Sequence, residues 1–456
     1  MPPRAASAGH MITVCCGEAQ IVLEDVCFGD VFLLSGQSNM QLTADRVMDC
    51  HGMEVTEANY PLIRHFTVEP RYYFGKLADD IPQGEWKKAI YPDVKEFSAA
   101  GFFFAKKLHK EIGVPIGLVL NAMGGSTVEA WMPEALLSKY GDFSDVLNKY
   151  KPDGALEAEV TFGENRENRW RSALFEGDMG TPLDRIPDGA EPFTVPGMCF
   201  GTRLEGWSGS VFFYKEIELE REPEGDALLY VGNIYESNIT YINGTRVGAI
   251  EYRYPPSKYP LEPGVLKKGR NIICTRILQK NGVGGFVHGH PYFLDSGAER
   301  IDLEGEWMMK PGTSIEPLED TLFPPVLPTC LYNASFWPIR EVNFTGMLWY
   351  QGESNAMQPE RYDEKFADMI AELRRRTGQR LPVVCTELCD FDDPGVKEHD
   401  KSGWQEIQRQ QREAPDKVPD CAVALGHDLG QPYDLHPQRK KELGDRMAKE
   451  MLRLAY

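Results

Sequence analysis

The stretch VFLLSGQSNM (31–40) carries the main signal for the fold. Its apolar residues predict a buried strand that stops at Ser35-Gly36 and is followed by Ser38 between two amides. Strand ends in α/β proteins present side chains to ligands, so Ser38 is a candidate nucleophile. A turn residue or a helix N-cap is the alternative interpretation of this serine.

The surrounding chain indicates repeated β-α units. From about 25 to 135 short apolar runs alternate with amphipathic stretches, such as the predicted helix at 101–113 and the predicted strand at 114–125, which ends at two glycines. Helical period returns at 361–376, a strand follows at LPVVCTEL, and Pro437 suits the first turn of a last helix. Such alternation is typical of a parallel sheet.

The middle of the chain has a different pattern. VFFYKEIELE (211–220) and GRNIICTRIL (269–278) predict strands, and Asn243-Gly244 is a strong hairpin signal. We therefore predict an antiparallel β-sandwich at 196–311, inserted between a first catalytic part at 25–195 and a second at 312–456. Residues 150–195 are polar, with no sustained period, and predict long loops or a linker.

Composition narrows the function. The 456 residues, 42% apolar, suit two or three domains with full cores, and a net charge of −20 argues against nucleic acid or an anionic membrane as partner. We expect no transmembrane helix and, without a signal-peptide core, a cytoplasmic protein. The ten cysteines lack zinc-site spacing, which predicts buried free thiols, no metal and no cofactor.

Three further stretches complete a constellation with the first. They are LNAMGGSTVEAWMP (120–133), GMLWYQGESNAM (346–357) and DLGQPYDLHPQRKKELGDRMA (428–448). Two of them follow candidate strands and the third precedes the last helix. The loops beyond the carboxyl ends of parallel strands meet at one crevice, so we expect these stretches to converge.

This set of residue types suits ester hydrolysis. His436 is the candidate base for Ser38, and Asp434 is close enough in sequence to orient the imidazole. The backbone N–H groups of Ser38 and Gly125 and the side-chain amide of Gln351 are the candidate oxyanion donors. Each residue also has a structural interpretation, such as a cap, a tight turn or a solvated loop.

Together these motifs resemble the sialate O-acetylesterase-like carbohydrate esterases of the SGNH hydrolase superfamily. The resemblance rests on GQSNM (36–40), GGS with EAW (124–131), WYQGESN (349–355) and DLHP (434–437), and it extends over about residues 20–456. It implies a flavodoxin-like, three-layer α/β fold with a parallel sheet and an inserted sandwich. It also implies removal of O-acetyl groups from sugars through a serine acyl-enzyme without metal.

Two departures from the superfamily pattern matter. Its acid usually stands three residues before the histidine, whereas Asp434 stands two before it, so Asp428 and Glu353 are reserve acids. Its third block usually supplies an asparagine to the oxyanion hole. Here Gln351 is the first choice and Asn355 the second.

The resemblance leaves the sugar open between O-acetylated sialic acid and acetylated plant oligosaccharides. A sialate carboxylate requires an arginine, for which Arg46, Arg64, Arg71 and Arg340 are available, whereas the acidic chain favours a neutral glycan. Trp131 is the candidate sugar platform, with core packing as its alternative. Glu353 and Asn355 are further candidate substrate contacts.

We therefore predict a carbohydrate O-acetylesterase that uses Ser38, His436 and Asp434, and the sequence leaves its assembly open between a monomer and a homo-oligomer. The alternatives are a general short-chain ester or thioester hydrolase and, from another class, a non-catalytic glycan-binding protein.

Overall fold

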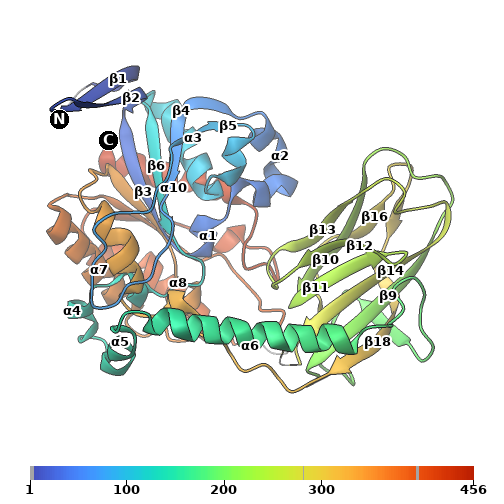
Figure 1. The fold of residues 1–456 in the computed structure, drawn as a ribbon. Coiled ribbons are helices and arrows are strands. Elements are labelled where there is room, and N and C mark those ends of the chain that lie inside the picture. The colour runs from blue at the N-terminus through green and yellow to red at the C-terminus, as the bar shows by residue number, and fades with distance from the viewer. Residues whose placement is uncertain (1–4, 281, 397–399) are drawn as a thin grey trace.

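A seven-stranded sheet forms the first of two regions in the computed structural model, which describes residues 5–280, 282–396 and 400–456. The strand order is β21-β20-β19-β3-β6-β4-β5, and all pairs are parallel except β4 with β5 (Figure 1). The strands are β3 (Asp30–Gly36), β4 (Asn59–Thr67), β5 (Lys87–Ile90), β6 (Ile116–Ala122), β19 (Gly346–Tyr350), β20 (Val383–Thr386) and β21 (Cys421–Ala424). The mixed α/β architecture predicted from the sequence is confirmed.

Amphipathic helices bury their apolar faces in the core of this region. The longer ones are α2 (Met48–Thr56), α3 (Ala99–Ile112), α7 (Tyr362–Thr377), α8 (Ser402–Arg412) and α10 (Lys440–Ala455). Helices α3 and α10 pack so closely that a Cβ at Gly444 would lie 2.7 Å from the backbone nitrogen of Phe104. Because α10 begins at Lys440, Pro437 precedes the helix and does not occupy its first turn.

The second region consists of two antiparallel six-stranded sheets (Figure 1). One has the order β12-β11-β14-β9-β18-β7, and the other has the order β17-β16-β10-β15-β8 with β13 beside β10. Their strands are β7 (Glu191–Val195), β8 (Gly197–Met198), β9 (Gly209–Leu219), β10 (Ala227–Tyr235), β11 (Ser237–Ile242), β12 (Thr245–Ile250), β13 (Pro256–Leu261), β14 (Gly269–Gln279), β15 (Gly285–Phe286), β16 (Tyr292–Asp295), β17 (Arg300–Asp302) and β18 (Gly305–Ser314).

Both sheets contribute to one apolar core. Phe213 of β9 meets Phe286 of β15 edge to face, with ring centroids 5.1 Å apart, and Trp307 of β18 packs against the same ring. The predicted hairpin at Asn243-Gly244 is confirmed, because β11 and β12 flank these two residues, which have φ values of +50° and +83°. Positive φ at both positions suits the tight turn of a twisted hairpin.

The prediction of loops or a linker at 150–195 is wrong, because α6 (Ala155–Gly177) is a helix of 23 residues. Figure 1 shows α6 running from the first region to the second. Its buried apolar residues are sparse: Leu156 joins the core of the first region, and Trp170 and Leu174 enter a small cluster with Leu278 and Leu318. An ion pair between the partly buried Glu167 and Arg171, one turn apart, supports the helix. Such a polar helix has little apolar periodicity to detect.

An antiparallel hairpin, β1 (Ser7–Cys16) and β2 (Ala19–Phe28), precedes β3 and is largely exposed. Cys274 and Cys385 are buried free thiols as predicted, whereas Cys15 and Cys16 are exposed on this hairpin. Within the described residues, no helix combines the length and apolarity needed to span a bilayer. The same residues hold no cluster of three or more His, Cys, Asp or Glu that could bind a metal ion.

Candidate active site

Ser38 lies just beyond the carboxyl end of β3, as the first residue of the short helix α1 (Ser38–Gln41). The next strands in the chain, β4, β5 and β6, lie on one side of β3, and the last three, β19, β20 and β21, lie on the other. Strand β3 therefore stands at the switch point of the sheet, where α/β proteins bind ligands. The turn requires glycine, because Gly36 has φ +127° and a Cβ there would lie 2.1 Å from the Tyr350 carbonyl oxygen. The first N–H groups of a helix have no intrahelical acceptor, which leaves that of Ser38 for a ligand.

The two-glycine turn after β6 lies against α1. Gly124 donates its N–H to Oε1 of Gln41 at 2.9 Å, and the Ser126 hydroxyl donates to the Gly36 carbonyl at 3.3 Å. In the described part of the chain, the N–H of Gly125 has no protein acceptor. Gly125 has φ +73°, and a Cβ there would lie 2.5 Å from the Phe323 ring. Only glycine fits this turn without strain.

His436 and Asp434 lie in the loop between β21 and α10. Oδ1 of Asp434 accepts the backbone N–H of His436 at 2.8 Å, and no hydrogen bond among the described residues joins this carboxylate to the imidazole. Nε2 of His436 is buried and has no hydrogen-bond partner within residues 5–280, 282–396 and 400–456. Burial, followed by the positive charges of Lys440 and Arg46, lowers the pKa of His436 to about 3. The imidazole is therefore neutral at pH 7 and can accept a proton.

Asn39, which follows Ser38, joins several of the motifs. Its Nδ2 donates to Oε1 of Glu353 at 2.7 Å and to the Leu435 carbonyl at 2.9 Å, and its Oδ1 accepts from Nζ of Lys440 at 2.7 Å. Burial raises the pKa of Glu353 and lowers the pKa of Lys440. One amide thus connects the Ser38 turn to the third motif, to the His436 loop and to α10.

Three predicted site residues, Gln351, Asn355 and Trp131, do not line the cavity that Ser38 and His436 share. Nε2 of Gln351 already donates to Gln37, Ser126 and Asn355 at 2.7–3.2 Å. Asn355 in turn accepts the backbone N–H of Val128 and donates to Glu129. Trp131 is 3% exposed, packs edge to face against Trp349 and donates Nε1 to the Ser126 hydroxyl. These side chains hold the second and third motif loops together.

Of the reserve acids, Asp428 lies outside the cavity. Its carboxylate accepts two hydrogen bonds from Arg446, at 2.6 and 2.7 Å, and this pairing lowers its pKa to about 2. Glu353 lines the cavity, and its Oε2 is buried without a partner among the described residues.

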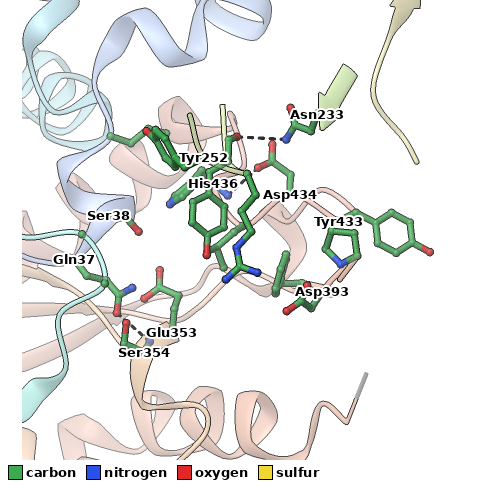
Figure 2. A pocket seen from close by; sticks show the side chains of 18 of the residues that line it. Gln37, Ser38, Asn233, Tyr252, Glu353, Ser354, Asp393, Tyr433, Asp434 and His436 are labelled. Atoms are coloured by element: carbon green, nitrogen blue, oxygen red, sulfur yellow. Dashed lines mark hydrogen bonds between the residues drawn. The ribbon is translucent and has the colours of Figure 1, made fainter. Parts of the chain in front are cut away.

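A cavity of about 920 Å³ brings the predicted residues together. Ser38, Gly125, Glu353, Asp434 and His436 all line it, and Figure 2 shows the side chains of Ser38, Glu353 and His436 around one opening. A volume of this size accommodates an oligosaccharide fragment.

The second region supplies part of this cavity wall, which the sequence did not predict. Its contributions are Asn233, Tyr235, Tyr252, Arg253, Tyr254 and Val287. Arg46 also lines the cavity, unlike Arg64, Arg71 and Arg340. A dense group of tyrosine and arginine in EYRYPPSKYP was the only local signal for this wall.

Comparisons with known proteins identify a family for this chain. The family model described as "carbohydrate esterase, sialic acid-specific acetylesterase" matches residues 28–158 and 326–453, together more than half of the chain. Sialate O-acetylesterase of Homo sapiens is 33% identical over 115 residues, which are 24% of this chain and 22% of that protein. The Rattus norvegicus sialate O-acetylesterase is 33% identical over 125 residues, 26% of this chain and 23% of that protein. The matched part is thus about a fifth of each relative.

A carbohydrate acetylesterase from Xanthomonas citri has a similar fold, with a TM-score of 0.56 and 21% identity. The similarity covers all of this chain and 63% of that chain. The two blocks matched by the family model contain Ser38, Gly125 and His436, all of which line the cavity. The chain therefore belongs to the family of sialic acid-specific acetylesterases among the carbohydrate esterases.

Proposed function

We propose that this protein is a carbohydrate O-acetylesterase that acts through an acetyl-serine intermediate. The observation that carries the proposal is the convergence of Ser38, Gly125 and His436 on one cavity, although they come from distant parts of the chain. Family membership supplies the reaction class, namely hydrolysis of an acetyl ester on a sugar.

The chemistry follows from these groups. Ser38 Oγ attacks the acetyl carbonyl carbon while the neutral His436 imidazole takes the hydroxyl proton. The tetrahedral oxyanion accepts hydrogen bonds from the backbone N–H groups of Ser38 and Gly125. The C–O bond to the sugar then breaks, and His436 returns its proton to the departing sugar oxygen. A water, deprotonated by His436, attacks the acetyl-serine, and acetate leaves as Ser38 recovers the proton.

Two backbone donors form the proposed oxyanion hole. The donors of the Gln351 amide are already engaged by three acceptors, so this side chain acts by holding the loops. Loss of one donor from such a hole typically costs about 10²–10³ in rate.

Asp434 is the proposed acid of the triad. Its hydrogen bond to the backbone N–H of His436 keeps the carboxylate on the same loop, two residues from the imidazole. In the proposed mechanism this carboxylate turns to the imidazole and stabilises the imidazolium that forms during attack. Glu353 is the competing candidate, and its bond to Asn39 supports a role in holding the Ser38 turn.

For the fold, the proposal includes the finer SGNH arrangement, in which an inserted sandwich at 196–311 separates catalytic parts at 25–195 and 312–456. The strand order around β3, the antiparallel sheets of the second region and their shared core support it.

Acetate release tests the proposed function. Wild type, Ser38→Ala and the remote control Ser144→Ala are compared on O-acetylated sialic acid and on acetylated xylo- and manno-oligosaccharides. We expect Ser38→Ala to lose turnover on the order of 10⁴-fold or more and Ser144→Ala to retain it. Asp434→Asn and Glu353→Gln then separate the two acids, because only loss of the triad acid should approach the Ser38→Ala defect. Full turnover in folded Ser38→Ala would refute the mechanism.

A further inference from the structure

The segment Tyr252–Arg253–Tyr254 of the second region faces the catalytic residues. It connects β12 to β13, and all three residues line the cavity. The Tyr254 ring meets the His436 ring edge to face, with centroids 5.1 Å apart. The Tyr252 ring in turn meets the Tyr254 ring edge to face, with centroids 6.1 Å apart. A residue next to Tyr254 is therefore positioned to contact a sugar whose acetyl group reaches Ser38.

Aromatic rings hold the Arg253 guanidinium. Its central carbon lies 4.8 Å from the centre of the Tyr235 ring and 5.4 Å from that of Tyr254. Nη1 donates a hydrogen bond to the Tyr235 hydroxyl. A guanidinium fixed by stacking and one hydrogen bond loses little further freedom when its other donors bind a ligand.

Among the described residues Arg253 forms no salt bridge, although the buried Glu236 carboxylate acts on its charge from beyond ion-pair distance. Three carboxylates also line the cavity, and each accepts a local backbone or side-chain hydrogen bond: Glu353 from Asn39, Asp434 from His436 and Asp393 from Gly395. Partly buried cations are usually paired, so an arginine in a binding cavity without a directly contacting carboxylate is suited to take one from the ligand. Its planar fork of N–H groups matches a carboxylate.

We propose that Arg253 binds a carboxylate of the substrate, so that the second region selects acidic acetylated sugars. This inference rests on the proposed function, whose cavity and ester chemistry it shares. It assigns to the second region a role in specificity, with the acetyl ester held at Ser38 and the acid group at Arg253. The local cation also overcomes the repulsion expected from a chain of net charge −20.

A cycle of two enzymes and two substrates isolates this contact. The substrates are O-acetylated sialic acid and the same compound with its carboxylate converted to a carboxamide, and acetate release is measured for both. Charge-assisted hydrogen bonds predict that wild type prefers the acid by about 10- to 100-fold in kcat/KM. In Arg253→Gln the preference should fall to about one, with the carboxamide rate within about threefold of wild type. Arg253→Lys, which keeps the charge but lacks the fork, should be intermediate.

Controls distinguish failure of the carboxylate site from failure of the proposed esterase activity. Arg340→Gln removes the same charge outside the cavity and should keep the wild-type preference. Binding of both deacetylated compounds to Ser38→Ala, with and without Arg253→Gln, is measured by calorimetry and needs no turnover. Absence of acetate release with Arg253-dependent binding of the acid would refute the esterase and keep the carboxylate site. An unchanged preference for the acid in Arg253→Gln, or equal losses on both substrates, would refute the carboxylate site. If Arg253→Gln does not fold, the same comparison is made with Arg253→Lys.

Discussion

Replacing Asn39 by alanine tests whether the residue beside the nucleophile organises the whole site. The side chain is 3% exposed and makes three hydrogen bonds, to Glu353, to the Leu435 carbonyl and to Lys440. The alanine variant removes all three and leaves two ionisable groups buried without this amide. The Ser38 turn would at the same time lose its connection to the His436 loop.

The size of the effect follows from these contacts. Hydrogen bonds to charged groups contribute about 1.5–3 kcal/mol each, and a neutral one about 1 kcal/mol. The penalty is limited, because burial raises the pKa of Glu353 and lowers the pKa of Lys440, which weakens the preference of both groups for the charged form. We therefore expect Asn39→Ala to lower the free energy of unfolding by about 4 kcal/mol, within the range for breaking buried charged contacts. This corresponds to a fall in melting temperature of about 5 °C.

The assay combines urea unfolding, followed by tryptophan fluorescence, with acetate release. Activity should fall by up to about 100-fold, because an error of about 1 Å in the reacting groups has that cost. Asn148→Ala, at an exposed position in α5 (Ser144–Tyr150), is the matched control. Adding Lys440→Met to Asn39→Ala should recover part of the stability by removing the buried amino group that has lost its acceptor. A change below 0.5 kcal/mol, with normal kcat, would refute the role of Asn39.

Three further outcomes are expected. Gly125→Ala places a Cβ 2.5 Å from the Phe323 ring at φ +73°, so kcat/KM should fall about 10- to 100-fold. Adding Phe323→Ala should relieve the clash but not the backbone strain. Wild-type rates in Gly125→Ala would contradict this prediction. The pKa of His436 is lowered to about 3, so the base stays neutral in mild acid. The value of kcat/KM for a neutral acetyl ester should therefore remain level from pH 7 to about 5. A half-maximal rate near pH 6.5, the ordinary pKa of histidine, would contradict this prediction. Burial, and then Lys87, lowers the pKa of His65 to about 3, below its value in the unfolded chain. The stability due to neutral His65 is therefore complete above about pH 6.5 and declines by about 1.4 kcal/mol per pH unit below it. The free energy of unfolding of His65→Gln, measured with urea, should therefore depend less on pH than that of wild type.

The elements that could be predicted from sequence are those with a strong local pattern. Helix α7 buries Tyr362, Phe366, Met369, Ile370 and Leu373, which are the residues its period predicts. The hairpin at 243–244 was predictable because its turn has a specific backbone requirement. Helix α6 was missed because it is mostly solvated and buries few residues, so neither its period nor its composition distinguishes it from a loop.

The candidate site divides in a similar way. Ser38, Gly125 and His436 were predictable because each closes a strand or precedes a helix, where the topology of a parallel sheet brings loops together. Arg253 and its neighbouring tyrosines were missed, because their place at the cavity depends on how the second region packs on the first. Sequence spacing carries no information about such a contact between distant segments.

The position of Gln351 shows that a motif residue need not touch substrate. The loops of the second and third motifs are buried and polar, so their groups require hydrogen bonds within the protein. Gln351 donates to Asn355, Asn355 donates to Glu129, and Lys365 completes the set with an ion pair to Glu129 at 2.7 Å. This arrangement holds Gly125 near Ser38 before any sugar enters, which is what a preorganised oxyanion hole requires. In the proposed mechanism the residues of the motifs carry out the reaction, whereas Arg253, proposed to bind the acidic group of the sugar, lies on the second region, outside every motif.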